Sequence, residues 1–87
     1  MGRFEVFISP DEPVYGISVV SRLLDIPVWT LRTLDKEGVV KARRTGRKGR
    51  FYCLKDVKKL GYIHYLMEEK GVNLKGVKLI LEKEKNI

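Results

Sequence analysis

The chain has 87 residues, 44% of them hydrophobic, and its 18 Lys and Arg residues outnumber 11 Asp and Glu residues, giving a net charge of +7. This length predicts one domain with a small core, and the hydrophobic content is typical of a globular fold. Because there is one cysteine and no apolar run near the roughly 20 residues that span a bilayer, the composition excludes an intramolecular disulfide, a cysteine-rich zinc site and a membrane-spanning helix.

The positive charge is concentrated in residues 41–59, which carry nine cations and one acid, a net charge of +8. Residues 1–40 carry a net charge of −2, and no acid lies between Glu37 and Asp56. A cationic block of this density repels itself, and such blocks are typical of surfaces that bind a polyanion. The alternative is a solvated basic surface without a partner.

Residues 1–14 are predicted to form an N-terminal arm. Phe-Glu-Val-Phe-Ile at 4–8 has the pattern of a short strand, and Pro10 and Pro13 then interrupt regular structure. We expect this arm to be ordered only if it pairs with another segment. Residues 15–87 are predicted to form the folded domain.

Two short helices are predicted at the start of that domain. Ser18 is a good helix cap, and apolar residues then fall on one helical face as far as Leu24. The second helix should run from Pro27 to Lys36, because proline is tolerated at a first helical position and Gly38 supplies a left-handed stop. Two short helices joined by a tight turn form a helix-turn-helix. The predicted buried stripes are Val19, Val20, Leu23 and Leu24 in the first helix and Val28, Leu31 and Leu34 in the second.

A basic β-hairpin, or wing, is predicted directly after the second helix. Residues 40–43 alternate apolar and basic side chains, as a half-exposed strand does. Residues 45–49 contain two glycines that suit a turn, and residues 50–52 have the pattern of the returning strand.

Two further helices complete the predicted domain. The third opens at Cys53 and keeps an apolar helical period to about Lys70, with Asp56 in the first turn, where the helix dipole favours a negative charge. Gly61 lies inside this helix and should cost about 1 kcal/mol relative to alanine. Asn73 is predicted to cap a fourth helix. The sequence therefore predicts a mainly α domain of about four helices with one small β-hairpin.

The second helix and the wing supply the two kinds of group that recognition of duplex DNA needs. Cations and backbone amides hold phosphates, and a projecting helix reaches base edges. Arg32 can pair with a phosphate or a guanine edge, and Thr30 and Thr33 can donate to phosphate or contact a thymine methyl group. Together these groups would neutralise roughly six phosphates, for a slope of log K against log salt near −5. The candidate contacts are Trp29, Thr30, Arg32, Thr33 and Lys36 in the helix and Arg43, Arg44, Arg47, Lys48 and Arg50 in the wing.

Several short motifs follow one another between residues 15 and 84 in the order found in one family. They are Ile17-Ser18-Val19, Thr30-Leu31-Arg32, Lys36-Glu37-Gly38-Val39-Val40, Arg44 and Gly49-Arg50-Phe51-Tyr52. In this order and spacing they resemble the N-terminal DNA-binding domain of the MerR family of transcription regulators. Residues 69–78 are similar to the heat-shock repressor HspR branch of that family.

The resemblance implies a MerR-type winged helix-turn-helix that binds operator DNA as a dimer. It implies that the second helix enters the major groove while the wing grips the flanking backbone. By position, the contact residues that carry over from the family are Ser18, Thr30, Arg32, Arg44, Arg50 and Tyr52.

The chain also departs from the family pattern. Leu34 stands where relatives often have a tyrosine, Ala42 where they have a proline, and Asp25 where a turn glycine is common. MerR regulators usually continue into a long helix that forms an antiparallel coiled coil between protomers, whereas this sequence stops at Ile87. A fragment, a different mode of dimerisation and a monomeric DNA binder all stay open.

We therefore expect a sequence-specific regulator of transcription, acting as a repressor if the HspR-like segment is meaningful, in the prokaryotic cytoplasm at the nucleoid. Its expected partner is double-stranded operator or promoter DNA, with a homodimer, a chaperone partner and a recombinase partner left open. The alternative is an excisionase-like architectural DNA-binding protein without a sensor domain. A third class is a protein-interaction module that adds the arm at residues 4–8 to a partner sheet.

The sequence offers little support for catalysis, and we expect no enzyme activity, no cofactor, no metal site and no membrane partner. No paired carboxylates stand at catalytic spacing with a base, and there is no nucleophile elbow or phosphate-binding loop. His64 is the single histidine and has no second nitrogen ligand. Cys53 is expected to be a small buried residue rather than a thiol sensor. Trp29 fits a cover over the core and a DNA contact equally well.

Overall fold

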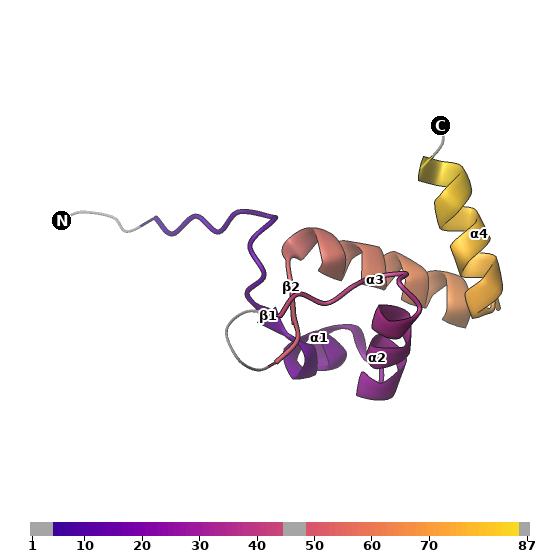
Figure 1. Ribbon diagram of the computed structural model, residues 1–87, viewed down its shortest axis with the longest axis horizontal. Helices are drawn as coiled ribbons and strands as arrows, with labels where there is room; N and C mark the ends of the chain where they lie inside the picture. Colours follow the sequence, from indigo (N-terminus) through magenta and orange to yellow (C-terminus); the bar gives the residue numbers. More distant parts are fainter. Residues whose placement is uncertain (1–4, 45–48, 86–87) are drawn as a thin grey trace.

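The computed structural model describes residues 5–44 and 49–85, which form four helices and a two-stranded antiparallel sheet (Figure 1). Their order is β1 (Tyr15–Gly16), α1 (Ile17–Leu24), α2 (Val28–Lys36), β2 (Phe51–Tyr52), α3 (Leu54–Glu68) and α4 (Leu74–Lys85). The prediction of a mainly helical domain with a small β element is confirmed. Within these ranges no helix combines the length and the apolar character that crossing a membrane requires.

The helix-turn-helix begins earlier than the sequence predicts. Gly16 caps α1, and Ser18 lies inside its first turn without a side-chain capping hydrogen bond, so the predicted Ser18 cap is wrong. The cause is a long-range contact, because the amide of Ile17 donates to the carbonyl oxygen of Arg50 at 3.0 Å and starts the helix directly after β1. Asp25 ends α1 in the left-handed conformation, with φ of 56°, and so adopts the backbone that suits a turn glycine.

The two helices bury different shares of their predicted stripes. Leu31 and Leu34 of α2 are fully buried, as predicted. In α1 only Val20 is buried, whereas Leu23 is 61% exposed and points away from the core. The buried face of α1 therefore centres on Val20, and the prediction that Val19 and Leu23 belong to it is wrong.

The returning strand of the wing, β2, pairs with β1 rather than with a long first wing strand. The register sets Tyr15 opposite Tyr52 and Gly16 opposite Phe51. On its other side Phe51 forms an isolated bridge to Arg43, with two N–O hydrogen bonds of 2.8 Å. Within the described residues the predicted hairpin consists of this bridge at its base, and residues 45–48 of the predicted turn at 45–49 lie outside the described part of the chain.

The N-terminal arm forms no strand over its described residues 5–8, which differs from the predicted strand at 4–8. Val6 and Phe7 are exposed, and no neighbouring strand offers them a partner within the described chain. The arm is held at its base, where the amide of Lys55 donates to the carbonyl oxygen of Pro10 at 3.3 Å and the Lys55 ammonium pairs with Asp11 at 2.9 Å. Figure 1 shows the arm extending away from the helices.

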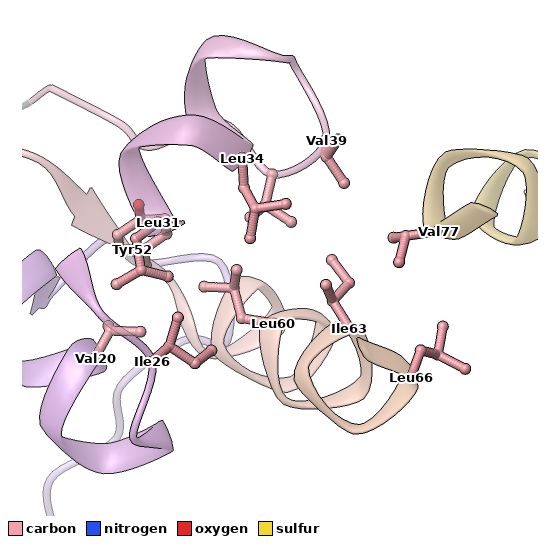
Figure 2. Packing of buried hydrophobic residues seen from close by; sticks show 11 residues of the cluster. Val20, Ile26, Leu31, Leu34, Val39, Tyr52, Leu60, Ile63, Leu66 and Val77 are labelled. Atoms are coloured by element: carbon pink, nitrogen blue, oxygen red, sulfur yellow. The ribbon is translucent and has the colours of Figure 1, made fainter. Parts of the chain in front are cut away.

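The core lies where α1, α2 and α4 meet α3 (Figure 2). Leu60 and Ile63 of α3 face Leu34 of α2 and Val77 of α4, and all four side chains are buried.

The predicted starts of two helices are confirmed by hydrogen bonds in their first turns. Asp56 accepts a hydrogen bond from the backbone N–H of Cys53 at the start of α3, at 3.1 Å, and Asn73 accepts one from Gly76 at the start of α4, at 2.8 Å.

Gly61 marks a position where alanine should stabilise the fold. Glycine inside a helix costs about 1 kcal/mol relative to alanine. A Cβ at Gly61 would lie 3.7 Å from Leu24 Cδ2, which is an ordinary contact. Gly61→Ala should therefore raise the free energy of unfolding by about 1 kcal/mol and the Tm by roughly 4–8 °C.

Gly76 of α4 provides the matched control for that substitution. A Cβ there would lie 2.7 Å from Val72 Cγ1, too close to be accommodated without a shift. Thermal unfolding should show a higher Tm for Gly61→Ala and no such gain for Gly76→Ala. A Tm for Gly61→Ala below that of the unsubstituted protein would contradict the packing described between α1 and α3.

Candidate nucleic-acid interface

One side of α2 is buried and the other carries exposed polar and aromatic groups. Leu31 and Leu34 anchor the helix in the core, while Arg32 and Lys36 are exposed on the opposite side. Trp29 is 70% exposed at the start of the helix, so it does not serve as a cover over the core. Because the apolar side of α2 is buried, its cations face the solvent, as they must in a helix that reads DNA.

The two threonines of α2 are half-buried, and one already has an internal partner. The Thr33 hydroxyl donates to the carbonyl oxygen of Trp29 at 2.9 Å. Its single proton is therefore engaged within the helix, and Thr33 presents a methyl group and a free lone pair rather than a free donor. Thr30 is the better candidate for a hydroxyl that donates to phosphate.

Asp35 joins the last turn of α2 to the base of the wing. Its Oδ1 accepts a hydrogen bond from the backbone N–H of Ala42 at 3.1 Å. Its Oδ2 accepts one from Nε of Arg50 at 3.2 Å and lies 3.7 Å from Nη2 of Arg44. A single carboxylate thus fixes α2 against the segments on both sides of the wing tip.

Sequence reasoning did not identify Asp35. The available signal was that it is the sole acid in the predicted second helix, and that an acid-free basic block follows shortly after it. An acid beside so dense a cationic block is expected to pair with one of its cations.

The remaining predicted contacts lie on α1 and at the base of the wing. Figure 1 shows α1 and α2 together on one side of α3, with the segment that leads into β2 beside α1. Ser18 is exposed in the first turn of α1, whose start is hydrogen bonded to Arg50. Arg43 and Arg44 are exposed at the wing base. Arg47 and Lys48 lie outside the described residues.

Tyr52 does not belong to this exposed surface. Its side chain is fully buried, and its hydroxyl has no hydrogen-bond partner among the residues that the structure describes. Burial, aided by the nearby negative charge of Asp35, raises the pKa of Tyr52 to about 12. Tyr52 is a core residue in this structure, which corrects its assignment as a DNA contact.

The burial of Tyr52 predicts a dependence of stability on pH. The phenol ionises less readily in the folded protein than in the unfolded chain, so its contribution is complete below pH 10 and is lost between about pH 10 and 12. Tyr52→Phe removes an unpaired hydroxyl and should not lower stability at neutral pH. Urea unfolding at pH 8 and pH 11 should show a smaller loss for Tyr52→Phe than for the unsubstituted protein, and an equal loss would contradict this account.

An apolar groove of about 500 Å³ lies at one end of α2, where the helix faces α3 and α4. Three of the predicted DNA contacts, Trp29, Thr30 and Thr33, line it together with apolar residues and the acid Glu68. Apolar walls and a carboxylate do not suit phosphate, so the predicted phosphate contacts of α2 are better represented by Arg32 and Lys36, which do not line the groove. In the described part of the chain, no cluster of three His, Cys, Asp or Glu residues could hold a metal ion.

Comparison with known proteins agrees with this geometry. Residues 15–84 match the family described as MerR HTH family regulatory protein. The chain is 38% identical over 80 residues to a candidate heat shock protein HspR from Streptomyces coelicolor, in an alignment that covers 92% of this chain and 53% of that protein. The chain thus spans about half the length of this curated relative, and the similarity supports the HspR branch. By the extent of these matches, the chain belongs to the MerR family of helix-turn-helix regulatory proteins.

Proposed function

We propose that this chain is the DNA-binding part of a transcription regulator, that it recognises a specific double-stranded sequence, and that it acts as a repressor. In this proposal α2 enters the major groove, and the basic wing binds the flanking phosphate backbone. The single observation that carries the proposal is the junction at Asp35, which holds the wing base beside α2. Membership of the MerR family supports DNA as the partner and a homodimer as the binding form.

The two parts of this surface would have different tasks. Arg32 lies on the exposed side of a rigid helix, where a guanidinium can make two hydrogen bonds to a guanine edge. Lys36 at the end of α2 and Arg43 in the wing, both exposed, would contact phosphates, which carry no sequence information directly. Trp29 would contribute an exposed ring at the start of α2 for contact with a sugar or a thymine methyl group.

The repressor role rests on the resemblance to the HspR branch. A repressor of this kind would occupy promoter DNA, so its binding sites should lie in front of genes. An excisionase-like architectural protein would use the same surface, but its sites should cluster beside a recombination site. The two functions therefore differ in the location of the bound DNA rather than in the chemistry of the contacts.

The experiment that tests the proposal is a selection of bound fragments from randomly sheared genomic DNA, followed by sequencing. We expect a recurrent duplex motif to be enriched over the input at moderate salt, at promoters. Enrichment beside an integrase gene would favour the architectural function. Retention of all fragments alike, or of none, would contradict sequence-specific binding.

A further inference from the structure

Asp35 is an acid placed within the most basic surface of the chain. Its side chain is 13% exposed, and it lies against two cations of the wing. A negative charge near the path of a phosphate backbone repels that backbone, so by charge alone Asp35 lowers the affinity for any DNA. The value of this residue must therefore come from the geometry that it imposes.

That geometry is a junction between segments that are distant in sequence. The carboxylate accepts from the backbone N–H of Ala42, seven residues later, and from Arg50, fifteen residues later. Ala42 precedes the wing tip and Arg50 follows it. Since both ends of the wing are held by one side chain of α2, the distance between α2 and the wing is set at this point.

The two arginines that face Asp35 are held unequally. Arg50 lies 3.2 Å from Oδ2, and its side chain is 33% exposed. Arg44 lies 3.7 Å from the same oxygen, and its side chain is 60% exposed. A charged hydrogen bond at the shorter distance is the stronger of the two, whereas an exposed pair at the longer distance contributes little. The Arg44 guanidinium can therefore leave Asp35 at low cost.

We propose that Asp35 is a positioning residue that sets the spacing between the base-reading helix and the phosphate-binding wing. Arg50 and the Ala42 N–H are its permanent partners, and Arg44 exchanges Asp35 for a phosphate when DNA binds. This inference rests on the proposed function. Its consequence is that Asp35 contributes to sequence discrimination although it contacts no DNA and opposes binding by its charge.

The test is Asp35→Asn, because asparagine keeps the shape and the acceptor for Ala42 but loses the charge. Its Kd for the duplex selected by the unsubstituted protein should rise about ten-fold, while its Kd for a random-sequence duplex should stay unchanged or fall. The quantity to measure is the ratio of the Kd for the random-sequence duplex to the Kd for the selected duplex, by fluorescence anisotropy at fixed salt. We expect this ratio to fall in Asp35→Asn. Charge alone would lower both constants together.

Glu37→Gln is the matched control. It removes an acid two residues further along, whose partner is the Lys78 ammonium of α4 at 2.7 Å rather than the wing. Both variants raise the net charge by one. Glu37→Gln should tighten binding to both duplexes by less than about three-fold and leave their ratio unchanged. Equal ratios for Asp35→Asn and Glu37→Gln would overturn the inference.

Two arginine variants keep the inference testable if Asp35→Asn does not fold. Arg50→Ala should lower the ratio of the Kd for the random-sequence duplex to the Kd for the selected duplex, as Asp35→Asn does, because it removes a permanent partner of the junction. Arg44→Ala should weaken both duplexes alike and make the salt slope shallower by about 1. An unchanged ratio for Arg50→Ala would overturn the inference.

Failure of the proposed function and failure of this inference give different results. If the unsubstituted protein itself selects no sequence, the proposed function fails. If it selects one and the ratios do not change in the variants, only the role of Asp35 fails.

Discussion

Replacing Arg32 with alanine should weaken binding to the selected duplex by about five- to 150-fold, corresponding to roughly 1–3 kcal/mol, and should relax the preference at one base position. Arg32 lies on the exposed side of α2, opposite the buried Leu31 and Leu34, so its loss does not disturb the core. A guanidinium that reads a base edge contributes to one sequence and not to others. The affinity for random-sequence DNA should therefore fall by much less, by about the effect of one lost charge.

Arg22→Ala is the control for this substitution. Arg22 is also exposed, but it lies in the last turn of α1, the helix before the proposed recognition helix. It should change the affinities for the two duplexes equally. Anisotropy titrations of both variants on both duplexes distinguish a base contact from a phosphate contact. Equal losses on the two duplexes for Arg32→Ala would show that Arg32 contacts phosphate and that the base contacts lie elsewhere.

Raising the salt concentration from 50 to 200 mM should weaken binding about one-thousand-fold, since roughly six neutralised phosphates predict a slope near −5. Most of this effect should come from the basic segment at residues 41–59 and its net charge of +8. Lys48→Ala should weaken binding to all sequences alike and make the slope shallower by about 1. The prediction for Lys48 rests on its charge, because this residue lies outside the described part of the chain.

Lys83→Ala supplies the control for the salt series. Lys83 is exposed on α4, which packs against the end of α3 and is remote from the wing base in Figure 1. Its loss should leave the slope unchanged. Equal changes in slope for Lys48→Ala and Lys83→Ala would mean that the net charge of the chain, rather than the wing, determines the electrostatic part of binding.

The sequence predicted the elements of this fold well where the signal was local. Leu31 and Leu34 mark the buried side of α2, and Asn73 marks the start of α4 through a hydrogen bond to a residue three positions later. Both signals depend on neighbours within one or two helical turns. Local periodicity and capping chemistry are then sufficient.

The errors arose where distant segments meet. The start of α1 depends on the pairing of Gly16 with Phe51, which no local pattern indicates. The predicted buried stripe of α1 is too wide, because in a helix of eight residues Val19, Val20 and Leu23 all fit an apolar face. Only packing against α2 and α3 selects Val20. Tyr52 was assigned to the surface by family position, although the β1–β2 pairing buries it.

The candidate site shows the same division. The cations of α2 and the wing could be identified from composition, because the acid-free segment is a property of the sequence. Asp35 could not, because its role depends on Ala42 and Arg50 reaching one carboxylate in three dimensions. The spacing of these three residues along the chain does not indicate that they meet in the folded protein.

The central claim is that α2 and the wing act as one surface for a DNA duplex. An NMR titration of the 15N-labelled protein with the selected duplex tests it most directly. We expect the largest amide shifts at residues 29–36 and 43–50, with one common midpoint, and little change at Leu79 and Glu82 of α4. Shifts confined to α2 or to the wing alone, or centred on α4, would contradict the claim.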